Sequence, residues 1–256
     1  MKKYFPFICL SFFCLLSVKC FSNNIYEITV YHFKEVQQET TLDTYLQTAY
    51  LPALHRQQIK SVGVFKPIAN DTAADKIIYV IVALKSLDDV LKLQSSLNKD
   101  AVYAEAGKAY LTASYQNPPY TRMEKILLTP FEKAPALTLP QLKSDKKDHI
   151  YELRSYESAT EYYHINKVKM FNEGGETKIF SSINANAVFY GDVIAGSHMP
   201  NLMYLTCYEN MADRDAHWKS FGDNASWKQL STMDEYKNNV SKAEVILMHA
   251  ASYSDY

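Results

Sequence analysis

The sequence predicts an α+β protein built from two diverged copies of one βαββαβ module, preceded by an export signal. Two recurring strand motifs carry this prediction. Residues 25–28 (IYEI) recur as 150–153 (IYEL), and residues 124–127 (EKIL) recur as 244–247 (EVIL). The same order of alternating and helical patterns follows in both copies. Self-similarity at a nearly constant offset indicates a duplicated structural unit.

The first 22 residues have the layout of a secretory signal. Two lysines precede an apolar run over 4–18, and small or polar residues follow it. The run is too short for a permanent transmembrane helix, which needs about 20 apolar residues. We therefore expect an exported protein, periplasmic or secreted, without a membrane span and with a mature chain that begins near Asn23. A lipid anchor at Cys20 is disfavoured because Lys19 stands where a small residue is needed.

Composition excludes several classes of protein. Only Cys207 of the four cysteines lies outside the signal, so an ordinary core must stabilise the chain without an internal disulfide. Once the three lysines of the signal are removed, 24 basic residues remain against 28 acidic ones. This balance argues against nucleic acid as a partner.

The first module is predicted over 23–130. Residues 25–32 alternate apolar and polar side chains, which predicts a strand. The spacing of apolar residues predicts a helix over 41–60, in which Pro52 requires a kink or a fresh start. The remaining elements are predicted as strands over 62–67, 76–84 and 122–129, with a helical region over 87–113.

The second module is predicted over 149–256, after a linker over 131–148 that is rich in proline and lysine. Its predicted strands are 150–156, 186–194, 202–208 and 243–250, and its predicted helices are 159–181 and 211–239. The shared order βαββαβ is that of the ferredoxin-like fold.

The first strand of each module indicates how the modules pair. We expect the helices to cover its apolar face, formed by Ile28, Val30 and Leu153. The opposite face then carries Glu27, Thr29, Tyr31, Glu152, Arg154 and Tyr156. A sheet whose second face is polar and aromatic needs a partner sheet. The two antiparallel sheets are therefore predicted to close into one barrel with a polar-aromatic interior, either within a monomer or between two chains of a homodimer.

Four motifs of the second module carry a family resemblance. They are 151–156 (YELRSY), 169–176 (KMFNEGGE), 188–191 (VFYG) and 199–204 (MPNLMY). Together they resemble the NIPSNAP family of the dimeric α/β-barrel superfamily. The first module is similar through 50–54 (YLPAL) and 62–65 (VGVF), but it has Thr29 where the second module has Arg154.

The resemblance implies two ferredoxin-like modules that pair as an intramolecular dimeric α/β-barrel, in a family whose members bind ligands or partners. It brings no catalytic residue. The difference between Thr29 and Arg154 argues against two equivalent sites.

Glu152, Arg154 and Tyr156 are the first candidates for a ligand site, because alternate residues of a strand share one face. Arg154 could orient a carboxylate or carbonyl of a ligand. The alternative is an internal ion pair with Glu152 that neutralises itself. Glu27 and Tyr31 occupy the corresponding face of the first module.

His164 is the remaining site candidate. It lies one helical turn after Glu161, a spacing that metal sites use, but the chain has no second such pair, so no metal site is expected. His164 could instead act as a general base at the barrel mouth. The sequence contains no glycine-rich phosphate loop and no nucleophile elbow, and we expect no cofactor.

Three functions fit these patterns. The first is a non-catalytic exported protein that encloses a small apolar or aromatic ligand. The second is a cofactor-free monooxygenase or isomerase, for which the superfamily gives precedent. The third is a module that binds a protein partner. The lack of an acid and base at a convincing spacing favours binding over catalysis.

Overall fold

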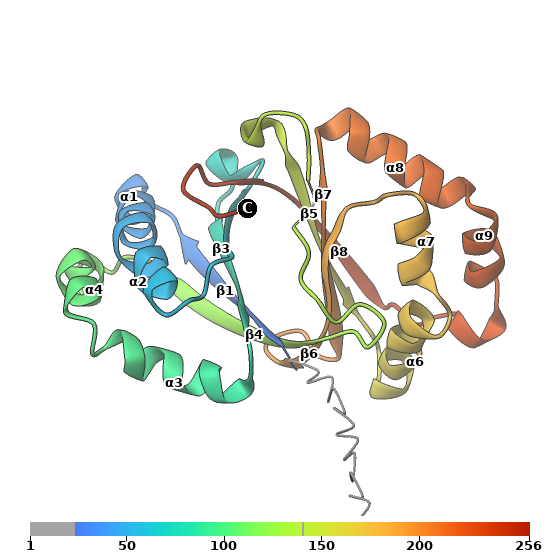
Figure 1. The fold of residues 1–256 in the computed structure, drawn as a ribbon, viewed down its shortest axis with the longest axis horizontal. Coiled ribbons are helices and arrows are strands. Elements are labelled where there is room, and N and C mark those ends of the chain that lie inside the picture. Colours follow the sequence, from blue (N-terminus) through green and yellow to red (C-terminus); the bar gives the residue numbers. More distant parts are fainter. Residues whose placement is uncertain (1–23, 140) are drawn as a thin grey trace, which may run out of the picture.

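Eight antiparallel strands close into one barrel in the computed structural model, with the helices outside it (Figure 1). The structure describes residues 24–139 and 141–256. The predicted signal over 1–22 and its Cys20 lie outside the described residues. The helices of the first module flank one side of the barrel, and those of the second module flank the other.

The elements of the first module are as follows. The strands are β1 (Ile25–Phe33), β2 (Val62–Pro67), β3 (Lys76–Leu84) and β4 (Arg122–Pro130). The helices are α1 (Val36–Tyr45), η1 (Leu46–Tyr50), α2 (Leu51–Arg56), η2 (Asn70–Thr72), α3 (Leu87–Leu97), α4 (Ala101–Ala106) and α5 (Lys108–Leu111).

The second module has the same arrangement. Its strands are β5 (Ile150–Glu157), β6 (Ala187–Ala195), β7 (Asn201–Tyr208) and β8 (Lys242–Ala250). Its helices are α6 (Glu161–Asn172), α7 (Glu176–Ser182), α8 (Met211–Asp223), α9 (Ala225–Ser231) and η4 (Asp234–Tyr236). The short helix η3 (Lys146–Asp148) precedes β5.

The strand order confirms the predicted fold class. The first sheet runs β4-β1-β3-β2 and the second runs β8-β5-β7-β6, and both are the antiparallel order of a ferredoxin-like module. Two seams join the sheets, because β2 pairs with β8 and β4 pairs with β6. Both sheets come from one chain, so the barrel is intramolecular.

The registers of the two modules also correspond. Val30 lies opposite Glu124 on β4, and Ser155 lies opposite Glu244 on β8. Glu124 and Glu244 therefore occupy equivalent positions on opposite sides of the barrel.

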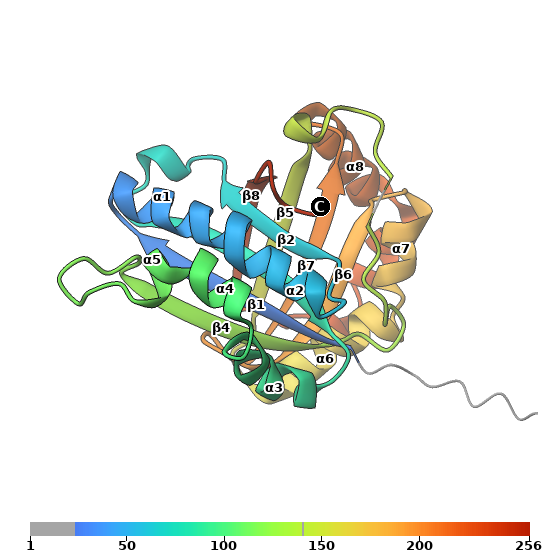
Figure 2. The same ribbon diagram turned by 60° about the vertical axis from the view of Figure 1, so that its left-hand side comes forward.

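The predicted helix over 41–60 is a continuous rod over 36–56 formed by α1, η1 and α2 (Figure 2). The π-helical segment η1 ends just before α2, which has Pro52 in its first turn. Proline lacks an N–H and clashes with the carbonyl four residues earlier, so a wider turn at this point lets the rod continue.

The predicted helix over 159–181 is two helices, α6 and α7, separated at Gly174 and Gly175. Gly175 has φ +84°, and a Cβ at Gly174 would lie 2.6 Å from the Met170 carbonyl oxygen. Only glycine fits both positions without strain. The predicted regions 87–113 and 211–239 are likewise divided into shorter helices.

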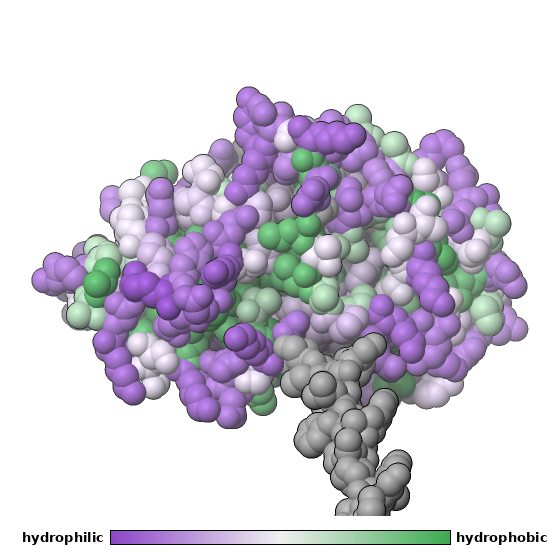
Figure 3. Space-filling model, in the orientation of Figure 1, coloured by the Kyte–Doolittle hydropathy of each residue, from purple (hydrophilic) through white to green (hydrophobic). Residues whose placement is uncertain are grey.

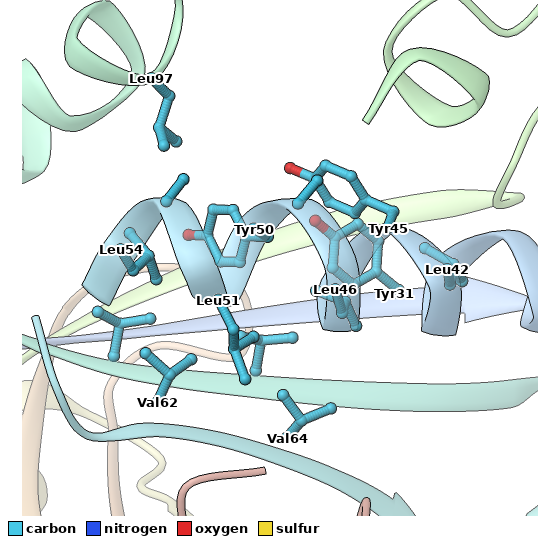
Figure 4. Close-up of a cluster of buried hydrophobic side chains, with 14 of the residues drawn as sticks. Tyr31, Leu42, Tyr45, Leu46, Tyr50, Leu51, Leu54, Val62, Val64 and Leu97 are labelled. Atoms are coloured by element: carbon cyan, nitrogen blue, oxygen red, sulfur yellow. The ribbon is translucent and has the colours of Figure 1, made fainter. Parts of the chain in front are cut away.

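One apolar layer joins the rod of the first module to its sheet (Figure 4). Leu42, Leu46 and Leu54 of the rod are fully buried, as are Val62 and Val64 of β2. Burying a leucine side chain contributes about 2 kcal/mol. In the second module, equivalent packing joins the four helices α6, α7, α8 and α9 to the sheet.

The predicted orientation of the first strands is wrong. Ile28, Val30 and Leu153 belong to the core inside the barrel, where they meet apolar side chains of both sheets. Glu27, Thr29, Tyr31, Glu152, Arg154 and Tyr156 therefore face the helices. The interior is apolar because an eight-stranded barrel leaves just enough room for side chains to fill it, and polar groups buried there would lose their contact with water.

The linker predicted over 131–148 is attached to the fold at Phe131 and at 143–144. Phe131 is buried, with its ring centroid 5.4 Å from that of Phe171. The Glu209 carboxylate accepts hydrogen bonds from the Ser144 hydroxyl and backbone N–H and from the Lys143 N–H. These bonds, that of the Ser144 hydroxyl first, lower the pKa of Glu209 to about 2.

Hydrophilic residues cover most of the face shown in Figure 3, and hydrophobic residues gather near its middle, between the two helical layers. Of the helices that the structure describes, none is long and apolar enough to cross a membrane.

The barrel makes a prediction about the separated modules. Expressed alone, 23–130 and 149–256 should each self-associate, because each exposes the apolar sheet face that carries Ile28 or Leu153. Co-expression should restore a soluble one-to-one complex. Size-exclusion chromatography with light scattering checks this, and two well-behaved monomeric halves would contradict it.

Candidate functional site

Glu152 is the centre of a polar network beneath α8. Its side chain is fully buried and accepts hydrogen bonds from three donors. Arg154 Nε lies 2.5 Å from Oε1, while Arg214 Nε and Trp218 Nε1 lie 2.6 and 2.9 Å from Oε2. Arg214 and Trp218 are four residues apart on α8 and so share the face turned to the sheet.

Arg154 extends this network toward two tyrosines. Its Nη1 donates to the Tyr156 hydroxyl at 2.9 Å, and Tyr156 and Tyr204 join their hydroxyls at 2.8 Å. The Arg154 guanidinium also stacks on Trp218, with Cζ 3.6 Å from the ring centroid. A delocalised guanidinium suits such a cation–π contact.

A second buried ion pair lies beside the network, between α6 and α7. Lys167 Nζ is 2.8 Å from Glu176 Oε2 and 4.6 Å from the centroid of the Phe171 ring. Burial raises the pKa of Glu176, and the nearby Lys167 opposes that shift. The charges beneath the helices of the second module are thus paired with one another, as expected for the internal ion-pair alternative.

The first module fills the same position with tyrosines. Glu27 is buried and pairs with Lys125 Nζ, and Tyr31 packs edge-on against Tyr110. Tyr110 in turn stacks on Tyr45 with ring centroids 3.7 Å apart (Figure 4 labels Tyr31 and Tyr45). Glu27 and Tyr31 therefore belong to the helix-facing core and not to the barrel interior.

His164 lies on α6 and contacts β6, and it is not among the residues that line the pocket at the barrel mouth. Its Nε2 is 2.6 Å from Asp192 Oδ1, and its Nδ1 is buried without a hydrogen-bond partner in the described structure. The expected role of His164 as a base at the mouth does not fit this position.

A pocket of about 140 Å³ opens between the two sheets at one end of the barrel. We call it the mouth pocket. It is lined by Val30, His32, Ile77, Tyr79, Glu124, Ile126, Ser155, Ser197, His198, Asn201, Met203, Glu244 and Ile246. Six strands and the loop between β6 and β7 contribute to it, so both modules build one site.

Polar side chains form the rim of the mouth pocket. His32 Nδ1 lies 2.8 Å from Asp75 Oδ2, and its Nε2 lies 3.3 Å from Glu124 Oε1. The Ser197 hydroxyl donates to Glu124 Oε2 at 2.7 Å. The rim thus contains an imidazole between two carboxylates, an arrangement that can position a proton.

The floor of the mouth pocket is apolar, and beyond it the barrel is filled. Val30, Ile126, Met203 and Ile246 line the floor. At the opposite end the Phe65 ring packs against Tyr151 and Tyr256, with centroids 4.7 and 5.4 Å apart. A ligand can therefore enter from the mouth side.

Sequence reasoning missed the residues of the mouth pocket. The available signal was the recurrence of Glu124 as Glu244, which marks the same position in both modules. In the sequence, this recurrence is indistinguishable from ordinary repeat similarity. It indicates a pocket only once the topology places Glu124 of β4 and Glu244 of β8 at the same end of the barrel.

Within residues 24–139 and 141–256, no cluster of three or more His, Cys, Asp or Glu side chains could hold a metal ion. Cys207 is buried and burial raises the pKa of its thiol to about 12, so the thiol is inert at neutral pH.

Comparison with known proteins supports the assignment of the second module. The family model described as NIPSNAP matches residues 151–255. No curated protein matches the sequence.

Solved structures show the fold over most of the chain. A candidate monooxygenase from Lactobacillus acidophilus is similar with a TM-score of 0.56 and 12% sequence identity, over 89% of this chain and 94% of that chain. A candidate monooxygenase from Fusobacterium nucleatum is similar with a TM-score of 0.54 and 8% identity, over 90% of this chain and 93% of that chain. At these identities the likeness concerns the fold.

The network around Glu152 predicts strong coupling between its members. Glu152→Gln should cost about 3–5 kcal/mol in the free energy of unfolding, because it leaves the buried Arg154 without a carboxylate and takes from Arg214 one of the two that it contacts. Arg154→Met should cost about 2 kcal/mol, since Arg214 still pairs with Glu152. The double variant should cost less than the sum.

Chemical denaturation of the three variants measures these free energies. The matched control is Arg56→Met, which breaks the exposed pair with Asp100 and should cost under about 1 kcal/mol. Strictly additive losses at Glu152 and Arg154 would contradict the network.

Proposed function

We propose that this chain, whose second module is a NIPSNAP-family domain, is an exported small-molecule binding protein that takes its ligand at the mouth of the barrel. The mouth pocket carries the proposal. It combines an apolar floor with a few polar groups at the rim, the usual composition of a ligand site. The charged groups beneath α8 are paired with one another, with Arg154 and Arg214 both on the Glu152 carboxylate.

The size of the mouth pocket indicates a small ligand. Its volume of about 140 Å³ is close to the roughly 150 Å³ that accommodates benzene. Ile126, Met203 and Ile246 offer an apolar surface to such a body, and Met adapts its shape readily. We therefore expect a ligand with one small apolar or aromatic group held inside and a polar group at the rim.

An enzyme that transfers a proton is the second candidate, and His32 is the observation that favours it. Asp75 holds Nδ1 at 2.8 Å, which leaves Nε2, 3.3 Å from Glu124, as the ring nitrogen that would exchange a proton with a ligand. Isomerisation needs one group that takes a proton and returns it. Turnover of a bound ligand that disappears in His32→Gln while binding persists would support this function.

Closing the rim tests the binding function. Ser197→Trp should abolish the binding of small aromatic fragments, because Ser197 lies at the rim on the loop between β6 and β7 and an indole there would cover the opening. In wild type, fragments should shift the Met203 methyl resonance in NMR spectra, since Met203 lines the floor.

The control is Ser231→Trp, at an exposed serine on α9, which should bind like wild type. Fragment-induced shifts of Met203 that persist in Ser197→Trp would overturn the mouth pocket as the binding site.

Export is part of the proposal. The mature chain should begin near Asn23, and this cleavage would leave the barrel complete because β1 begins at Ile25. Intact mass of the protein from the periplasm or the medium measures the processed N-terminus. A chain that keeps its first 22 residues, or that carries lipid at Cys20, would contradict the soluble exported form.

A further inference from the structure

Four carboxylates surround the mouth pocket, and three have partners. Asp75 contacts His32 Nδ1, and Glu124 contacts His32 Nε2 and the Ser197 hydroxyl. Glu157 Oε1 lies 3.0 Å from Lys242 Nζ and 3.4 Å from His198 Nδ1. The fourth, Glu244, lines the pocket and is exposed; among the described residues it makes no hydrogen bond or salt bridge, and after the hydrogen bond to Glu157 its charge helps to raise the pKa of Lys242.

Tyr79 is a second group without a partner. Its side chain is 7% exposed and lines the mouth pocket, yet its hydroxyl makes no hydrogen bond within the described structure. Burial, and after it the charges of Glu244, Glu124 and Asp75, raises the pKa of Tyr79. The phenol thus stays neutral among carboxylates, with an oxygen free to accept a hydrogen bond.

The basic side chains of the rim already have partners. Lys242 pairs with Glu157, and Arg122 is exposed and donates to the Thr121 carbonyl oxygen. His32 is held between Asp75 and Glu124. Glu244 and the Tyr79 oxygen are therefore hydrogen-bond acceptors for which the mouth offers no donor. An anionic ligand would meet the unpaired negative charge of Glu244.

We propose that the mouth pocket binds a small primary ammonium compound, with its apolar or aromatic body on the floor. An ammonium has three donors, and Glu244, Tyr79 and Glu124 present acceptors to it from opposite sheets. Val30, Ile126, Met203 and Ile246 cover the body of the ligand. This assignment of a ligand class rests on the proposed binding function at the same pocket.

Three probes of one shape and different charge test the assignment: benzylamine, benzyl alcohol and benzoate. Benzylamine should bind wild type and shift the Met203 methyl resonance, and benzyl alcohol should bind at least tenfold more weakly. Benzoate should not bind. Glu244→Gln should weaken benzylamine about tenfold and leave benzyl alcohol unchanged, and Tyr79→Phe should weaken benzylamine to a smaller degree.

The control is Glu105→Gln, which removes the same charge from an exposed position on α4 and should bind benzylamine like wild type. Equal binding of benzylamine and benzyl alcohol, unaffected by Glu244→Gln, would overturn the ammonium class while the binding function stands. Failure of all three probes to shift Met203 would overturn both.

Discussion

The closure of eight strands into one barrel is the constraint on which the rest of the structure depends. A barrel of this size has an interior that side chains just fill, so each strand turns one face to that core. Helices cover much of the outer face, while β4 and β8 keep exposed residues there, such as Met123 and Val245. The apolar faces of both modules merge into one core around Ile28 and Leu153. Buried polar groups therefore lie mainly in the layer beneath the helices and at the barrel end, where the core stops.

The sequence predicted the fold because its repeated motifs form the same structural elements in both modules. Equivalent motifs sit in equivalent registers, with Val30 opposite Glu124 and Ser155 opposite Glu244. Alternation along a strand divides its side chains between two faces, but it does not say which environment each face meets. That is why Leu153 was assigned to the helices when it lies inside the barrel. The break at Gly175 required knowledge of a backbone angle, φ +84°, that composition alone does not give.

The candidate site was harder to predict than the fold for a related reason. Glu152 and Arg154 stand out in sequence because they are charged and adjacent on one face, and that same adjacency lets them neutralise each other. Glu124, Glu244 and Tyr79 come from three strands of two modules, so no local pattern joins them. Their common feature is that they line one opening of the barrel, and only the assembled barrel reveals it.

Divergence between the modules makes the two sides of the mouth pocket chemically different. The registers place Tyr79 opposite Val30 in the first module and Met203 opposite Ser155 in the second, so a phenol on one side corresponds to a thioether on the other. His32 of the first module likewise corresponds to Glu157 of the second. A pocket between two identical chains would accept a ligand in either of two orientations. Here the two sides of the mouth pocket differ in hydrogen bonding and in charge, so the proposed ligand would meet a different surface in each orientation.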